Sequence, residues 1–487
     1  MRKSFDPQQR LDCQPVLNVR LNLDCRDEII PILRALQHIY SRPELRDGIL
    51  RAIARDVNRT SSRKRGRAGL HYWQILVLAA VRLGCDLDYD KLQDLAEQHR
   101  ALRQIMGIGD WEEHTTFDWR RIRDNLTKIR PETLERINQL VVDAGHELAP
   151  EAAETVRADS FVVQTNIHYP TDSSLIRDGL RKILTLGATL AFLLGVGGWR
   201  QQKHLYRKVR KLARKIDRIA ARKGTGYQQR LKAPYRELLA LADTIVDRAE
   251  TLRIAAQNAA GDLELLALDA ELAVFLERTR HVCGTARRRV LEGQQVPNAE
   301  KLFSIFEPHT QLYKRGKTAE PVQFGRQLLV YEDGAGFITH AYLLPRDADD
   351  RDVVVDQTRR LQKRLGGRIR RASFDRGFHS PENQRELANI IEHPCLPMPG
   401  RHQAAEQAQS ASIEFRQARQ RHPGIESAIA ALQSGNGLMR CRDRTEHGFR
   451  RYLQLGVLGR NLHLLGKLLI AQDGRDRPAA QSRRKAA

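Results

Sequence analysis

Three acidic residues occupy positions where sequence patterns favour metal-dependent chemistry. Asp159 lies inside an otherwise apolar, strand-like run, where a buried carboxylate needs strong compensation. Asp375 ends a second strand-like run, directly before an Arg-Gly pair where a turn exposes it. Glu426 falls in the first turn of a predicted helix, after a Pro-Gly pair. The three acids therefore come from separate elements.

Each of these acids also has an ordinary structural explanation. An Asp at the end of a strand often serves as a cap or a turn residue, and the helix dipole favours an acid in a first helical turn. Asp172 and Asp178 compete with Asp159 for the first position. Asp172 is the stronger turn acid, because it lies in a Pro-Thr-Asp-Ser segment.

Carboxylates from separate elements suit the cutting or joining of phosphodiesters. The reaction places a water or a 3′-hydroxyl in line with the leaving oxygen and neutralises charge on phosphorus, and two divalent ions about 3.5 to 4 Å apart do both. Mg²⁺ is a hard cation that prefers oxygen ligands. Asp159 and Asp375 are therefore candidate ligands for such ions.

The charge of the chain points to a polyanionic partner. Among 487 residues, 82 Lys and Arg stand against 59 Asp and Glu, which gives a net charge of +23 and a pI near 10.1. Nucleic acid is the leading candidate, although ribosomal, histone-like and membrane-surface proteins carry a similar excess. Hydrophobic residues make up 41% of the chain, which excludes a wholly disordered protein.

Neither secretion nor a membrane span is expected. No apolar run of signal-peptide length follows the charged start of the chain. The longest uncharged stretch, Ile183 to Trp199, has 17 residues and holds four Gly, so a buried helical segment is expected instead of a span of roughly 20 residues. The six Cys are far apart and form no CxxC pair, which indicates neither a zinc site nor a disulfide framework and fits a reducing cytoplasm.

The N-terminal third is predicted to be helical. Residues 27–57 have helical spacing of apolar side chains, and two further helices are expected at His71–Leu83 and Asp88–His99. Another helix is expected to start near Thr115 or Thr116. It carries three candidate DNA-binding cations: Arg120, Arg121 and Arg123. This order fits a helix-turn-helix-like unit, and a small packed bundle fits it equally well.

Strands and helices alternate in the rest of the chain. A strand-like run begins near Glu154, and a helical block then continues for more than a hundred residues. The segment from Trp199 to Lys223 carries eleven Lys or Arg and one Asp around an apolar seam, and predicts a basic amphipathic helix. A hairpin is expected at 322–344, a helix at 350–365 and a strand at 368–374. The order is mixed α/β, with the helical block as an insertion.

Several motif blocks resemble a known family. The stretch RADSFVVQTNIHYPTDSSLIRDGLR (157–181), then FDRGFHSPEN (374–383), then GIESAIAALQSGNGLMRCRDR and GFRRYLQLGVLGRNLHLLG (424–466), resemble bacterial insertion-sequence transposases of the ISNCY group. The resemblance covers roughly residues 65 to 466. Those proteins are similar in turn to the RNase H-like DDE superfamily, whose acids are an Asp on the first strand, an Asp after the fourth strand and a Glu on a later helix.

The resemblance implies both a site and a substrate. It places the catalytic and metal-binding acids at Asp159, Asp375 and Glu426, with two Mg²⁺ ions for which Mn²⁺ can substitute. It implies double-stranded DNA, as element ends and as target, a homodimer or larger synaptic assembly, and a bacterial cytoplasm with association to the nucleoid. Many relatives carry an Arg and a Lys around the Glu, where this chain has His422 and Gln433.

Pattern and resemblance together predict an RNase H-like α/β core with a large helical insertion, preceded by an all-α, helix-turn-helix-like domain. The expected parts are a helical N-terminal DNA-binding region (1–150), the first part of the core (151–181), a basic helical insertion (182–305), the remainder of the core (306–470) and a disordered basic tail (471–487).

Other cations are candidate phosphate contacts, although solvated surface charge explains them equally well. They are Lys208, Arg210, Lys211, Lys314, Arg315, Lys317, Arg450 and Arg451. Two other functions also fit the sequence: a non-enzymatic helix-turn-helix regulator or inactive transposase derivative, and an RNase H-like nuclease that cuts without joining. Terminal inverted repeats beside the gene separate the transposase from that nuclease.

Overall fold

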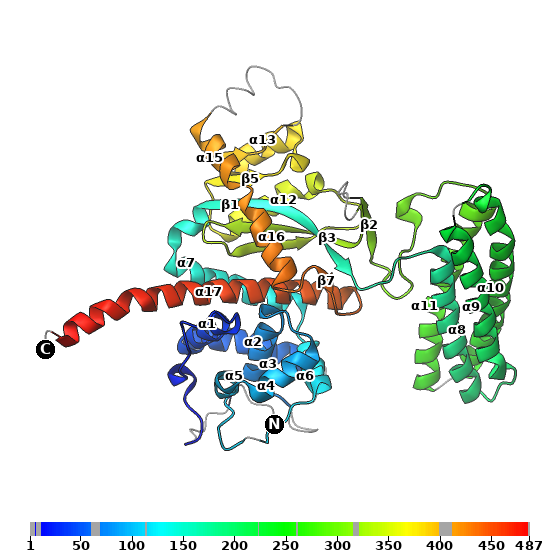
Figure 1. Ribbon diagram of the computed structural model, residues 1–487, viewed down its shortest axis with the longest axis horizontal. Coiled ribbons are helices and arrows are strands. Elements are labelled where there is room, and N and C mark those ends of the chain that lie inside the picture. Colours follow the sequence, from blue (N-terminus) through cyan, green and yellow to red (C-terminus); the bar gives the residue numbers. More distant parts are fainter. Residues whose placement is uncertain are drawn as a thin grey trace. The chain divides into compact units, whose positions relative to one another are not determined.

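The protein is seen here in a computed structural model (Figure 1). The structure describes residues 5, 11–59, 69–112, 114–222, 224–259, 262–314, 321–398 and 412–485, with side chains through Gly474. The chain forms two compact units. Unit 1 joins residues 1–164 to residues 326–487, and unit 2 consists of residues 165–325. The mixed α/β class expected from the sequence is confirmed.

Unit 1 begins with a series of helices. Their bounds are η1 (Val16–Asn18), α1 (Ile29–Ser41), α2 (Pro43–Arg59), α3 (Tyr72–Gly84), α4 (Tyr89–Gln98), α5 (Arg100–Ile105), α6 (Trp119–Leu126), α7 (Pro131–Leu148) and η2 (Pro150–Glu154). The single helix expected over 27–57 is wrong, because Pro43 has no N–H to donate and starts a new helix. The expected start near Thr115 or Thr116 is also wrong. The Asp118 side chain caps α6 instead, by accepting from the Arg120 N–H at 2.8 Å.

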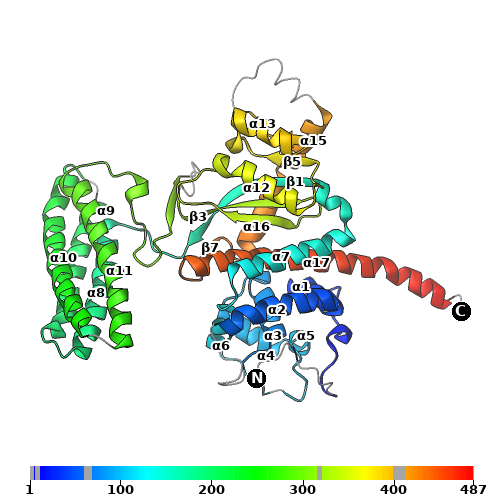
Figure 2. The same cartoon turned by 180° about the vertical axis from the view of Figure 1, so that it is seen from behind.

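A mixed sheet forms the middle of unit 1 (Figures 1 and 2). Its strands are β1 (Thr155–Thr165), β3 (Val322–Asp333), β4 (Ile338–Leu343), β5 (Arg371–Phe374), β6 (His393–Cys395) and β7 (Arg440–Cys441). Along the sheet the order is β3-β1-β5-β6, with β4 beside β3 and β7 beside β1. β5 is parallel to both β1 and β6, whereas β3 and β4 form the expected antiparallel hairpin. The first four residues of β3 belong to unit 2 and pair there with β2 (Gln311–Lys314).

Helices cover both faces of this sheet. The remaining helices of unit 1 are α12 (Asp350–Arg364), η6 (Arg376–Phe378), α13 (Pro381–Ile390), α15 (Ile413–Arg421), α16 (Gly424–Ser434) and α17 (Glu446–Lys485). On one face, Val156 and Ala158 of β1 pack in a core with Val354 and Leu361 of α12. On the other face, Phe161 of β1 belongs to a larger core that includes α16, α17 and the N-terminal helices.

Two features of unit 1 differ from the expected boundaries. The N-terminal helices share one continuous core with the sheet, so residues 1–150 belong to the same compact unit as the strands. Helix α17 continues to Lys485, into the segment 471–487 that was expected to be disordered. The Ala, Gln, Arg and Lys residues of that segment are good helix formers, which the compositional argument left out of account.

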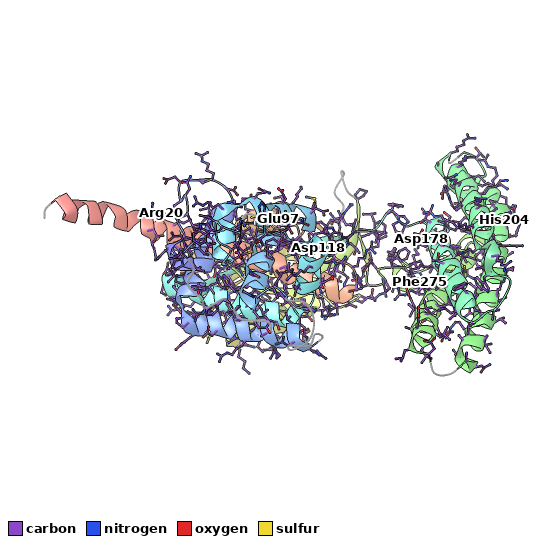
Figure 3. All side chains as sticks on the ribbon, turned by 90° about the horizontal axis from the view of Figure 1, so that it is seen from below. Arg20, Glu97, Asp118, Asp178, His204 and Phe275 are labelled. Atoms are coloured by element: carbon purple, nitrogen blue, oxygen red, sulfur yellow. The ribbon has the colours of Figure 1, made fainter. Side chains whose placement is uncertain are left out.

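Unit 2 is built on four long helices with a core of its own. Its helices are α8 (Asp172–Leu193), η3 (Trp199–Gln201), α9 (Gln202–Ala221), α10 (Tyr227–Asn258), α11 (Leu263–Ala286), η4 (Arg287–Leu291) and η5 (Asn298–Glu300). Leu180, Val209, Leu238 and Leu276 bring all four long helices into one buried cluster. Figure 3 shows the side chains, with His204 labelled on α9 and Phe275 on α11. The unit extends further at both ends than the insertion expected over 182–305.

Candidate catalytic site

Strand register places the two aspartates side by side. β1 and β5 are parallel, and Ala158 of β1 lies opposite Phe374 of β5. Asp159 and Asp375 each come next along their strands, so they occupy neighbouring positions at the same level of the sheet. Side chains alternate between the faces of a strand, and Ala158 and Phe374 both point into the α12 core. Both aspartates therefore face the opposite side, where α16 lies.

Glu426 reaches this side of the sheet from a helix start. It lies in the first turn of α16, as expected, and its side chain is exposed. The Asp375 side chain is also exposed, and that of Asp159 is half-buried. The backbone N–H of Ser160 donates to a carboxylate oxygen of Asp159 at 2.7 Å. Two of the three acids are thus open to solvent on the face that α16 covers.

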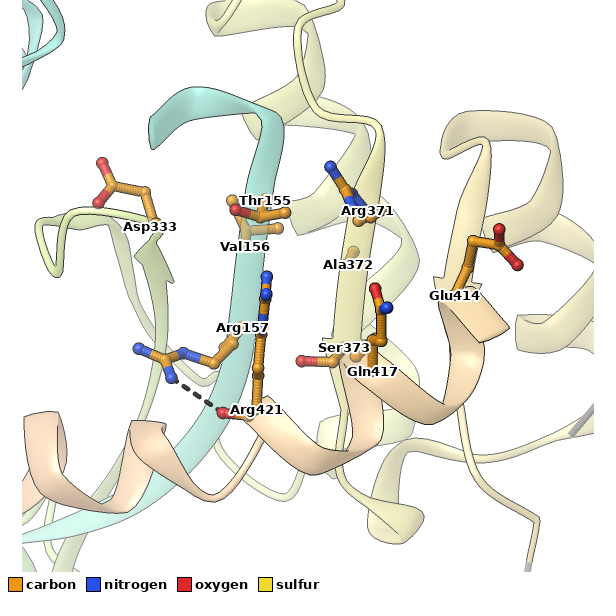
Figure 4. A pocket seen from close by; sticks show the side chains of 12 residues that line it. Thr155, Val156, Arg157, Asp333, Arg371, Ala372, Ser373, Glu414, Gln417 and Arg421 are labelled. Atoms are coloured by element: carbon orange, nitrogen blue, oxygen red, sulfur yellow. Dashed lines mark hydrogen bonds between the residues drawn. The ribbon is translucent and has the colours of Figure 1, made fainter. Parts of the chain in front are cut away.

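Arg157 joins β1 to the start of α16. Its Nη1 donates to the carbonyl oxygen of Arg421 at 2.9 Å, and its Nη2 donates to Oε2 of Glu332 at 2.6 Å. A Cβ added to Gly424 would overlap the Arg157 guanidinium, so a larger residue at this position would displace that side chain. Figure 4 shows the hydrogen bond between Arg157 and the carbonyl oxygen of Arg421 as a dashed line. Arg157 has the same strand parity as Asp159, which places both on one face.

His422 lies between the second aspartate and the glutamate. Its Nδ1 is 3.1 Å from Oγ of Ser373, two residues before Asp375 on β5. Burial lowers the pKa of His422; Asp375 and Glu426 oppose this effect, and Arg157 adds to it. Both carboxylates are therefore close enough to act on the imidazole.

The acids do not form a complete metal centre in this structure. Among the described residues, no group of three or more His, Cys, Asp and Glu side chains lies close enough together to hold an ion. Carboxylate oxygens nevertheless match the ligand preference of Mg²⁺. The strand register puts two of the carboxylate residues, Asp159 and Asp375, next to each other. The donor chemistry fits the ion, and the three acids would have to come closer together to hold it.

A cavity lies near the starts of β1 and β5, and none of the three acids is among the described residues that line it. Its volume is about 280 Å³, and the side chains around it are shown in Figure 4. The lining comes from the first residues of β1 and β5, from the turn after β3 and from α15. Arg157, Arg371 and Arg421 contribute the cations, and Asp333 and Glu414 the acids. The mixed charge of the walls does not define one ligand.

The two rival acids belong to unit 2. Asp172 is the first residue of α8, and one carboxylate oxygen lies 3.3 Å from Arg289. Burial raises the pKa of Asp172, against the effects of Arg289 and Lys301. Asp178 lies 3.6 Å from both His168 and Arg177. Asp159, in contrast, belongs to the same unit as Asp375 and Glu426.

The candidate DNA-binding cations differ in exposure. Arg120 and Arg121 are exposed on α6, and Arg120 and Arg123 lie over the ring of Trp119. Lys208, Arg210 and Lys211 are exposed on α9, and Lys314 is exposed at the end of β2. Arg450 pairs with Glu446 at 2.9 Å on the surface of α17. Arg315 and Lys317 lie outside the described residues.

Arg451 has a structural role instead of a surface one. Its guanidinium is 7% exposed and lies 3.0 Å from Asp443, which also pairs with the buried Arg82 at 2.6 Å. Burial alone would raise the pKa of Asp443, but the two arginines outweigh burial and lower it. Burial and pairing disfavour a contact between Arg451 and DNA, because its charge is already neutralised inside unit 1.

Sequence reasoning missed Arg157, Ser373 and Gly424 as parts of the site. One local signal was present: Arg157 and Asp159 are two residues apart in a predicted strand, so their side chains share one face. The partners of Arg157 gave no signal, because they lie 264 and 175 residues away in the chain.

Comparisons with known proteins do not identify the chain. No protein-family model matches it. Neither the curated proteins nor the solved structures give a match. Within the described part of the chain, no helix is long and apolar enough to cross a membrane.

Proposed function

We propose that this protein is a DDE-type transposase that cuts DNA at the ends of an insertion sequence and joins the 3′-hydroxyl ends to target DNA. The observation that carries the proposal is the register of β1 and β5, which sets Asp159 beside Asp375 on the face covered by α16. Glu426 starts that helix, so all three acids named by the motif resemblance lie on one side of one sheet.

The strand order supports an RNase H-like core. Within unit 1, β1, β3, β4 and β5 follow one another in the chain. Asp159 lies on the first of these strands, Asp375 directly follows the fourth, and Glu426 lies on a later helix. This is the order of acids in the DDE superfamily that the motifs resemble. Unit 2 enters between the first and second strands of that series.

The side chains of this site have separate tasks in the proposed reaction. Asp159 and Asp375 would hold divalent ions with Glu426, and the bound Mg²⁺ or Mn²⁺ supplies an activated oxygen nucleophile and neutralises the phosphoryl oxygens. Arg157 holds the end of α15, three residues before the start of α16, against β1 through its contact with the Arg421 carbonyl oxygen. The imidazole of His422 presents a polar group between Asp375 and Glu426, where a phosphate of the DNA backbone has to approach.

The remaining parts of the chain would bind DNA. The exposed arginines at the start of α6 favour end recognition by a helix-turn-helix-like unit in the N-terminal helices. Two ends have to be held together, so the proposal includes a homodimer or a larger synaptic assembly. It also includes a cytoplasmic location at the bacterial nucleoid, because the substrate is chromosomal DNA.

Metal-dependent cleavage tests the proposal. A duplex carrying the inverted repeat that flanks the gene is incubated with Mg²⁺ or Mn²⁺, and nicked and joined products are separated on denaturing gels. We expect Asp159→Asn, Asp375→Asn and Glu426→Gln each to reduce both products by at least about 100-fold, while binding persists. Asp356→Asn is the matched control, because Asp356 is an exposed acid of α12 that pairs with Arg359. Full activity of the three variants contradicts the assignment.

A non-enzymatic DNA-binding protein is the second candidate. One observation favours it, namely that no three potential ligands among the described residues stand at metal-binding spacing. Under this alternative the wild type binds end-containing duplex and never cuts it with either ion. Cleavage without joining would instead favour the RNase H-like nuclease.

A further inference from the structure

Helix α9 of unit 2 carries an unusual concentration of positive charge. Its 20 residues include one acid, Asp217, and eight cations: Lys203, Arg207, Lys208, Arg210, Lys211, Arg214, Lys215 and Arg218. Val209, Ala213 and Ile216 are buried in the bundle core, and they fix which side of the helix faces inwards. At 100° per residue, Arg207, Lys211, Arg214 and Arg218 centre on the opposite side. We call these four residues the outer stripe of α9.

The charges of the outer stripe are not neutralised by any residue that the structure describes. None of its four side chains makes an ion pair with a described residue of the chain. Asp217, the acid of the helix, accepts a hydrogen bond from Ser173 at 2.8 Å. Of the other cations of α9, Lys215 has an acidic neighbour, Glu237, at 3.7 Å. The helix therefore retains nearly all of its positive charge at its surface.

Several other cations of the same unit are paired with acids. Lys182 lies 2.7 Å from Glu271, Arg280 lies 3.0 Å from Glu250 and Arg287 lies 2.9 Å from Asp243. Arg288 and Glu300 are 2.6 Å apart. Cations on α8, α11 and η4 are thus neutralised by nearby acids, whereas α9 has one such pair among its eight cations. Like charges at helical neighbour spacing repel, so the helix accepts a cost that an anionic partner would remove.

We propose that the outer stripe of α9 is a sequence-independent contact to the phosphate backbone of double-stranded DNA. The inference rests on the proposed function, which supplies DNA as the partner, and adds the surface of unit 2 that holds it. The stripe consists of Lys and Arg alone, which bind phosphates without reading bases. From Arg207 to Arg218 it spans roughly 16 Å of helix, enough to face several successive phosphates.

Two other anionic partners fit this surface less well. The apolar side chains of α9 are buried in the bundle, so the helix has no apolar face to insert into a lipid surface. The stripe contains no aromatic side chain on which unpaired bases stack, which disfavours a single strand. Binding to the phosphate backbone of a duplex requires only cationic side chains, and the stripe consists of these.

The test is the salt dependence of binding in the full-length protein. Fluorescence anisotropy is measured on two unrelated 30-base-pair duplexes that lack element ends, in EDTA, over a series of KCl concentrations. For a variant carrying Arg207→Gln, Lys211→Gln, Arg214→Gln and Arg218→Gln, we expect the slope of log K against log salt to become shallower by roughly 3 to 4 on both duplexes.

A matched variant controls for net charge. It carries Lys182→Gln, Arg280→Gln, Arg287→Gln and Arg288→Gln, which removes four cations of the same unit that are already paired, and we expect its slope to remain close to that of the wild type. Circular dichroism checks that both variants are folded. An unchanged slope in the stripe variant overturns the inference, as does an equal change of slope in the control variant. A stripe variant that loses binding to phosphatidylserine vesicles and keeps its binding to DNA also overturns it. Cleavage is not measured here, so failure of the stripe leaves the test of the catalytic acids untouched.

Discussion

At the scale of single residues, Arg157 has the most consequential contacts of the candidate site. Its guanidinium is 26% exposed and bridges the carbonyl oxygen of Arg421 and the carboxylate of Glu332, which is 5% exposed. Burial raises the pKa of Glu332, against the effects of Arg157 and Arg460. Removing Arg157 therefore leaves a buried acid short of a partner and frees the start of α16 from β1.

We predict that Arg157→Met destabilises unit 1 by about 1 to 3 kcal/mol, because a buried group loses its hydrogen bonds. DNA cleavage falls further than the loss of folded protein explains, since α16 carries Glu426. Urea denaturation measures the stability, and single-turnover cleavage measures the activity. The double variant with Glu332→Gln is expected to recover most of the stability and little of the activity. Recovery of both would mean that Arg157 does not position α16.

The residues of the site were predictable to different degrees. Asp159, Asp375 and Glu426 follow from strand and helix patterns together with motif blocks, and the structure places all three on one side of the sheet. Local patterns carry no information about partners far along the chain, so the contacts of Arg157 and His422 had to come from the fold. The burial of Arg451 could not be predicted, because the sequence alone does not show whether a charged side chain is buried or exposed.

At the scale of elements, helix α17 depends on glycine where it crosses its neighbours. A Cβ on Gly459 would lie 2.6 Å from the backbone nitrogen of Gly84 in α3. A Cβ on Gly466 would overlap the carbonyl group of Pro31 in α1. Backbone cannot move aside as a flexible side chain does, so the two crossings require residues without side chains.

Gly466→Ala is expected to destabilise unit 1 by about 2 to 3 kcal/mol through this overlap. Gly474→Ala lies on the same helix with nothing within 4 Å of the added Cβ. That control is expected to leave stability unchanged or raise it by up to about 1 kcal/mol, because Ala is the better helix former. Differential scanning calorimetry compares the two variants, and equal transition temperatures would contradict the close crossing.

Elements were predicted from sequence more accurately than their limits. The helices at 71–83, 88–99 and 350–365 and the hairpin at 322–344 appear within a few residues of their expected ends. Errors arose where one local signal was outweighed by another. Pro43 divided an otherwise continuous apolar periodicity, and Asp118 capped α6 in preference to two upstream threonines.

At the scale of the whole molecule, unit 2 is inserted into unit 1 and has a separate core. Every member of its buried cluster lies between Leu175 and Ile305, and the two other clusters consist of residues of unit 1. We predict that replacing residues 165–325 with about ten Gly and Ser residues, a linker spanning roughly 17 Å on average, leaves unit 1 folded. The isolated fragment 165–325 is expected to fold as well.

Calorimetry on the three proteins checks this prediction. The linked unit 1 and the isolated unit 2 should each melt cooperatively, within a few degrees of the corresponding transitions in the full chain. The absence of a cooperative transition in either piece would show that the cores depend on each other. The limits of unit 2 were predicted too narrowly. Its first long helix already begins at Asp172, and at its C-terminal end β2 and the start of β3 lack the helical periodicity that marked the block at 182–305.

The insertion also has a consequence for the order of folding. β1 and β3 are neighbours in the sheet, yet all of unit 2 separates them in the chain. Closing a flexible loop of that length costs roughly 4 to 5 kcal/mol in chain entropy, apart from a constant. Within unit 2, Tyr169 and Phe324 meet edge to face with ring centroids 5.5 Å apart, near its two ends. A bundle that folds first therefore brings the two ends of the loop together. β1 can pair with β3 only after the ribosome has synthesised the bundle between them.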